Sequence, residues 1–151
     1  MKWTLWFIAF IAVEVMAKEP LRVAINQTPY SVVLRLTSFE EIKQGVDAYY
    51  EIQADVLEEI RGNFSSHISF KMYAAKGDEP NLGAAASIIV LCHDDQGYFW
   101  PGTGSEFKAS KQNIAIAKEA AEYQTEEQEL FSLCPQYWIL NHGDGRGLSS
   151  S

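Results

Sequence analysis

The spacing of apolar residues changes along the chain, and each spacing predicts a different element. From residue 38 to residue 61 the apolar residues recur every three, four or seven positions, which predicts one face of an amphipathic helix. These residues are Phe39, Ile42, Val46, Tyr49, Val56 and Ile60. Ser38 and Glu41 match a capping box at the start of this helix, and Gly62 is a natural stop. The alanine-rich segment Lys111–Phe131 predicts a second helix.

Short β-branched, alternating or continuous apolar runs predict the strands. They cover residues 21–25, 30–36, 67–73, 87–92 and 136–140. Residues 67–73 alternate as in a half-buried strand, and the unbroken run 87–92 is typical of a central strand buried on both faces. Loops are expected at 76–83 and 93–105. The sequence therefore predicts an α+β fold, with two amphipathic helices packed against a small sheet of short strands.

The N-terminal segment has the pattern of a secretory signal peptide. Lys2 precedes the apolar run Trp3–Val13, and small or β-branched residues follow at positions 15 and 17. The run is too short to span a bilayer stably; the alternative is an uncleaved membrane anchor. We expect a signal peptide over 1–17, a single domain over 18–140 and a flexible Gly- and Ser-rich tail over 141–151. The expected location is extracellular.

The charge of the chain limits its partners. The net charge is −8, and the Lys and Arg residues form no cluster. Nucleic acids and anionic membranes both attract basic patches, so neither is an expected partner. With 47% hydrophobic and 21% charged residues, the composition is typical of an ordinary globular domain.

Two cysteines and two sequons bear on covalent chemistry outside the cell. In a secreted chain Cys92 and Cys134 are expected to form one disulfide; the alternative is a pair of buried free thiols. On the chain-entropy model the bridge stabilises the fold by roughly 4 kcal/mol. Asn26 and Asn63 each begin an N-glycosylation pattern, and Asn63 is the better candidate because its context is turn-like.

One candidate metal site can be assembled from His93, Asp95 and His142. The expected disulfide would bring the segment holding His93, Asp94 and Asp95 toward His142 and Asp144, and zinc takes about three such ligands. In the other interpretation the aspartates are turn residues and His142 belongs to the tail, so that no metal or other cofactor is bound. We favour this second interpretation. No histidine has a second one four positions away, so a His-Glu-x-x-His helix is absent from the sequence.

The most distinctive loop candidate is the aromatic run Tyr98, Phe99 and Trp100, followed by Pro101 and Gly102. Three aromatics in this context favour a recognition surface, because rings bury much area at low entropic cost. In the alternative, Phe99 and Trp100 cover the hydrophobic core.

The contexts of the two cysteines resemble those of a peptidase family. A strand ending in Cys92 and the later element Leu133-Cys134-Pro135-Gln136-Tyr137-Trp138 are similar to fungal deuterolysin-like zinc metalloendopeptidases (aspzincins, lysine-specific type) over roughly residues 40–142. The family's zinc-binding helix would follow the Cys-Pro element, and this sequence has none. The resemblance therefore implies a truncated or degenerate relative, and no catalytic residue is carried over.

These patterns predict a secreted, non-catalytic binding protein, such as an effector, that acts on an extracellular protein or peptide partner. The alternative is a metallopeptidase-like hydrolase that takes zinc. A third hypothesis is small-ligand binding in a cleft, which would appear as thermal stabilisation by the ligand.

Overall fold

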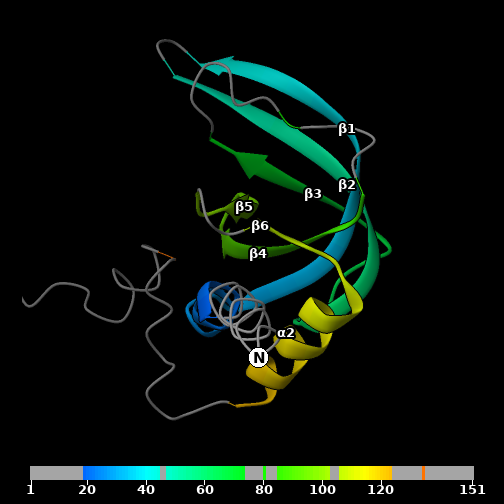
Figure 1. Ribbon diagram of the computed structural model, residues 1–151. Coiled ribbons are helices and arrows are strands. Elements are labelled where there is room, and N and C mark those ends of the chain that lie inside the picture. The colour runs from blue at the N-terminus through cyan, green and yellow to red at the C-terminus, as the bar shows by residue number, and fades with distance from the viewer. Residues whose placement is uncertain are drawn as a thin grey trace, which may run out of the picture.

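The computed structural model describes residues 19–44, 47–73, 80, 85–102, 106–123 and 134 (Figure 1). Residues 19–26 form an N-terminal helix, and six strands and a further helix follow. Their bounds are β1 Tyr30–Gln44, β2 Asp47–Arg61, β3 His67–Met72, β4 Ser87–Asp94, β5 Gly97–Trp100, β6 Glu106–Lys108 and α2 Lys111–Glu122.

The strands close into a barrel. β1 pairs antiparallel with both β2 and β4, and β2 pairs antiparallel with β3, which gives the order β4-β1-β2-β3 of a Greek key. β5 closes the gap, parallel to β3 and antiparallel to β4, and β6 adds a short edge to β4. A five-stranded Greek-key barrel is the architecture of the OB-fold. Because one architecture hosts many functions, it does not identify a function here.

Side chains on the two faces of the barrel wall form separate cores, which explains the runs of consecutive buried residues. The inner core fills the barrel with Val32, Leu34, Tyr50, Ile52, Ala54, Ile68, Phe70, Ile89 and Leu91. The outer core lies between the wall and the two helices and contains Leu21, Ala24, Ile25, Val33, Ile88, Val90, Ile116, Ala117 and Ala120. In both β1 and β4, alternate residues therefore serve different cores. The prediction that residues 87–92 form a strand buried on both faces is confirmed.

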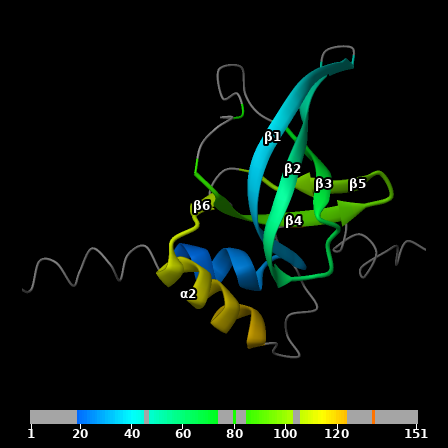
Figure 2. The ribbon, with the colours of Figure 1, turned by 90° about the vertical axis from the view of Figure 1, so that its right-hand side faces the viewer.

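The predicted helix over 38–61 is wrong, because this segment belongs to the β1–β2 hairpin. Buried residues recur there at every second position, as in a strand. Tyr50, Ile52, Ala54 and Val56 all pack into the inner core. The pairing of β1 with β2 shifts register at three places, and such bulges bend a strand and increase its twist. The hairpin accordingly curves around the barrel, and its far end extends beyond the other strands (Figures 1 and 2).

Two shorter predictions are also corrected. Residues 21–25 are helical rather than extended, because Leu21, Ala24 and Ile25 lie on one helical face that packs in the outer core. Residues 97–100 of the expected loop form β5. The strand expected at residues 67–73 is confirmed as β3.

The second helix is confirmed over Lys111–Glu122 and ends at its C-cap, Tyr123. The α+β class is confirmed in outline, with a larger sheet than expected. The predicted signal peptide at 1–17, the last strand at 136–140 and the tail at 141–151 lie outside the described residues. Neither described helix has the length and apolar character needed to cross a membrane.

Candidate binding pocket in the barrel

A small pocket opens among the strands of the barrel. All five barrel strands and β6 contribute to its lining, which consists of Leu36, Ile52, Phe70, Met72, Pro80, Ile89, Trp100 and Glu106. Its volume is about 140 Å³. A dry apolar cavity of about 150 Å³ holds one benzene molecule, so the pocket has the size of a single small ring.

Trp100 enters the pocket because β5 is a strand. Successive side chains of a strand point to opposite faces, so Tyr98 and Trp100 share the inner face while Phe99 lies on the other. Both inner-face rings pack against the inner core. Of the three predicted binding residues, the structure thus places two on the inner face and only Trp100 at the pocket. The interpretation in which Trp100 covers the core and the one in which it binds a ligand are therefore both compatible with its position.

The indole of Trp100 carries a polar atom without a partner. Its Nε1 is buried, and no acceptor lies within hydrogen-bond distance among the described residues. Most buried N–H groups are paired, and leaving one unpaired costs roughly 1–3 kcal/mol. A ligand that supplied an acceptor to this N–H would remove that cost.

Glu106 is the ionisable residue among the described residues of the lining. β6 pairs with β4 so that Glu106 lies opposite Ile89, and the Glu106 side chain is exposed. Its Oε1 accepts a hydrogen bond of 2.9 Å from the Ser87 hydroxyl. The other described lining side chains are apolar, apart from the Trp100 N–H.

Other aromatic rings surround Tyr98. Its ring centroid lies 5.2 Å from that of Tyr30, 5.5 Å from that of Phe64 and 4.9 Å from that of His93. Burial raises the pKa of the Tyr98 phenol, and the nearby Tyr30 raises it further when that residue is ionised. These contacts give Tyr98 a packing role at the wall of the barrel.

The predicted metal ligands are only partly within the described residues. His93 and Asp95 are both exposed, and His142 lies outside the described part. Asp94 accepts a hydrogen bond from the Gln96 backbone N–H, as a turn residue does. Within the described ranges, no three histidine, cysteine or acidic side chains come together in a group that could hold a metal ion.

The two sequons occupy different surroundings. Asn63 is exposed on the connection between β2 and β3. Asn26 is half-buried at the end of the N-terminal helix, and the Thr28 of its sequon is fully buried, with its hydroxyl donating to the Ala24 carbonyl at 2.8 Å. Glycosylation at either site stays a prediction.

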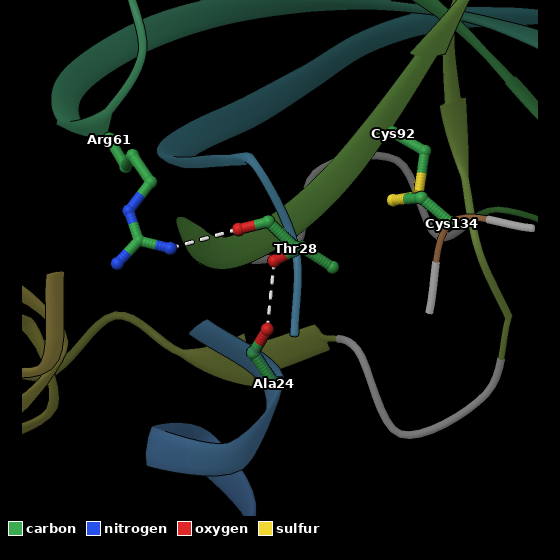
Figure 3. Close-up of a disulfide and its surroundings, with 5 residues drawn as sticks. All are labelled: Ala24, Thr28, Arg61, Cys92 and Cys134. Atoms are coloured by element: carbon green, nitrogen blue, oxygen red, sulfur yellow. Dashed lines mark hydrogen bonds between the residues drawn. A yellow bond between two sulfur atoms is a disulfide. The ribbon is translucent and has the colours of Figure 1, made fainter. Parts of the chain in front are cut away.

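Arg61 connects the two helices to the barrel, and the disulfide joins Cys134 to β4 (Figure 3). Nη1 of Arg61 donates to the carbonyls of Ile25 at 2.7 Å and Thr28 at 3.0 Å, and its Nη2 donates to that of Ala121 at 3.3 Å. Burial lowers the pKa of the Arg61 guanidinium. Cys92 and Cys134, both buried, form the expected disulfide.

Several of these residues were not singled out by the sequence. The role of Arg61 was missed because the residue was assigned to the end of a helix. Ile52 and Leu36 could have been found from their spacing of two with Tyr50 and Leu34, but their meeting with Trp100 depends on barrel closure.

Comparison with known proteins does not add an assignment. No protein-family model matches the chain, and no curated protein matches it in sequence.

Proposed function

We propose that this chain is a secreted, non-catalytic binding protein whose ligand occupies the barrel pocket. The observation that carries the proposal is the joint presence, at one pocket, of an apolar lining and the unpartnered indole N–H of Trp100. Apolar walls with a few polar groups that orient the ligand are the usual composition of a small-molecule site.

Two further features support this proposal. The buried disulfide is typical of proteins that work in an oxidising, extracellular compartment. Among the described residues of the lining Glu106 is the one ionisable side chain, and they include no nucleophile with an adjacent base. Binding is therefore the activity that the pocket supports best.

The size of the pocket sets the expected affinity. Burying a ring the size of a phenylalanine side chain yields about 1.5–3 kcal/mol, and relief of an unpartnered N–H adds to this for ligands with an acceptor. A ring without an acceptor should therefore bind with a Kd of roughly 10–100 mM, and a ring whose acceptor also satisfies the N–H with a Kd of roughly 1 mM.

The test is a calorimetric titration of the purified protein with p-cresol, a single ring whose hydroxyl oxygen can accept a hydrogen bond from the Trp100 N–H. We expect saturable binding to the native chain and at least tenfold weaker binding to Met72→Trp, because Met72 lines the pocket from the half-exposed end of β3 and a larger side chain would fill it. The matched control is Leu57→Trp, which adds the same indole at a side chain that is 46% exposed and not part of the lining. The proposal is refuted if p-cresol does not bind, or if it binds equally to native and Met72→Trp proteins.

A further inference from the structure

The described lining of the pocket carries a negative charge at Glu106. The other side chains of this described lining are apolar or carry only the indole N–H. Oε1 of Glu106 is engaged by the Ser87 hydroxyl, but a carboxylate offers about four acceptor positions, so the group can still receive donors from a ligand. A cationic donor matches this carboxylate best, since charge-assisted hydrogen bonds are roughly twice as strong as neutral ones.

The net charge of the whole chain has the same sign as the charge of Glu106. The net charge of −8 attracts cations and repels anions from the molecular surface. An anionic ligand would have to place a second negative charge beside Glu106, and a neutral one would leave the carboxylate without an ionic partner.

The apolar part of the ligand is limited by the walls. Phe70 and Trp100 are aromatic, and Ile52 and Ile89 are bulky and β-branched, so the walls suit a ring. The volume of about 140 Å³ admits one ring and not two. The indole of Trp100 is also the aromatic side chain that interacts most favourably with an ammonium group.

On the basis of the proposed function, we propose that the natural ligand class is a small primary amine carrying one aromatic ring with a hydrogen-bond acceptor, such as a phenol oxygen. The ring occupies the apolar pocket with this acceptor toward the Trp100 N–H, and the ammonium group lies at the rim beside the Glu106 carboxylate. A lysine side chain of a protein partner offers an ammonium but no ring, so it fits the walls less well.

The experiment compares tyramine, 4-(2-hydroxyethyl)phenol and 3-(4-hydroxyphenyl)propionate by calorimetry at pH 7 on the full chain. These ligands present the same phenol ring, with its acceptor oxygen, and carry a cation, a neutral hydroxyl and an anion, respectively. We expect the amine to bind about threefold to tenfold more tightly than the alcohol, and the carboxylate to bind more weakly than either.

Two variants separate the local carboxylate from the net charge. Glu106→Gln should remove the preference for the amine and leave the affinity for the alcohol unchanged. Glu122→Gln removes the same charge from an exposed position on α2 and should keep the preference. A thermal melt of each variant checks that it folds; if Glu106→Gln does not, the native protein's ranking of the three ligands decides the matter.

The outcomes distinguish the inference from the function on which it rests. Equal binding of amine and alcohol, or an unchanged preference in Glu106→Gln, overturns the amine assignment and leaves a binding pocket. Tighter binding of N-acetyl-lysine methylamide than of tyramine also overturns it, in favour of a peptide partner. If none of the compounds binds, both the inference and the proposed function fail.

Discussion

Replacement of Arg61 should weaken the attachment of both helices to the barrel. Its guanidinium donates to Ile25 in the last turn of the N-terminal helix, to Thr28 just beyond it, and to Ala121 in the last turn of α2. The last carbonyls of a helix have no partner within the helix, and they carry the negative end of its dipole. The single Arg61 guanidinium thus donates hydrogen bonds to a terminal carbonyl of each helix.

The expected loss in the free energy of unfolding follows from the three hydrogen bonds of Arg61. A hydrogen bond to a charged group contributes about 1.5–3 kcal/mol, and the low end applies because Arg61 is only half-buried. Two short bonds at this value and a weak contribution from the 3.3 Å bond predict that Arg61→Ala lowers the free energy of unfolding by about 3 kcal/mol. Arg61→Lys keeps the charge but lacks the fork of donors, so it should recover about half of this loss.

The assay is urea unfolding followed by far-UV circular dichroism at pH 7. Arg35→Ala is the control, because Arg35 is exposed on β1 and its loss should change the free energy by less than about 0.5 kcal/mol. If Arg61→Ala is no more destabilising than Arg35→Ala, the guanidinium does not hold the helix ends and the reasoning is refuted.

Three other predictions concern the barrel wall. The disulfide closes a separation of 42 residues, so replacing Cys92 and Cys134 by alanine should cost about 4 kcal/mol in urea unfolding; an unchanged stability would contradict its role. Gly62 has φ of 104°, and a Cβ there would lie 2.7 Å from Cδ1 of Tyr30, so Gly62→Ala should cost about 1–3 kcal/mol, and a neutral effect would show that the turn relaxes freely. The raised pKa of Tyr98 means that its phenol should ionise above the ordinary tyrosine pKa of about 10, so Tyr98→Phe should reduce the 295 nm absorbance change in the high-pH part of a titration. Because the folded-state pKa is raised, the associated stability is complete below the unfolded pKa of about 10 and is lost as the pH rises through the folded value.

Local patterns were sufficient where only one period fits the apolar residues of a segment. The alternation of Ile68 and Phe70 predicted β3, and the unbroken run from Ile88 to Cys92 predicted β4. The disulfide followed from cysteine count and compartment, and the second helix from its composition.

The β1–β2 hairpin could not be predicted from spacing alone, because two periods fit the same residues. Phe39, Ile42 and Tyr49 follow a helical period, while Tyr50 and Ile52 follow the strand period. Many glutamate, glutamine and alanine residues in the segment favour a helix, but pairing with β3 and β4 overrides this local preference. Gly45, unfavourable inside a helix, was the available signal that the segment is not one continuous helix.

The pocket could be predicted from the sequence even less well than the hairpin. Trp100 was recognised as a candidate, but its partners come from strands far apart in the chain, and they meet only because β5 closes the barrel between β3 and β4. Glu106 carried no motif at all, since its importance rests on the pairing of β6 with β4.

The most direct test of the account is a nuclear magnetic resonance titration of the protein with p-cresol. The indole N–H proton of Trp100, assigned with Trp100→Phe, is followed together with the methyl groups of Ile52 and Ile89. If the barrel pocket is the binding site, these signals shift together along one saturable curve, while methyl groups of the outer core at Ile25 and Ile116 stay in place. If the Trp100 and inner-core signals do not move at millimolar p-cresol, or if only the outer-core signals shift, the barrel pocket is not a binding site and the central claim is contradicted.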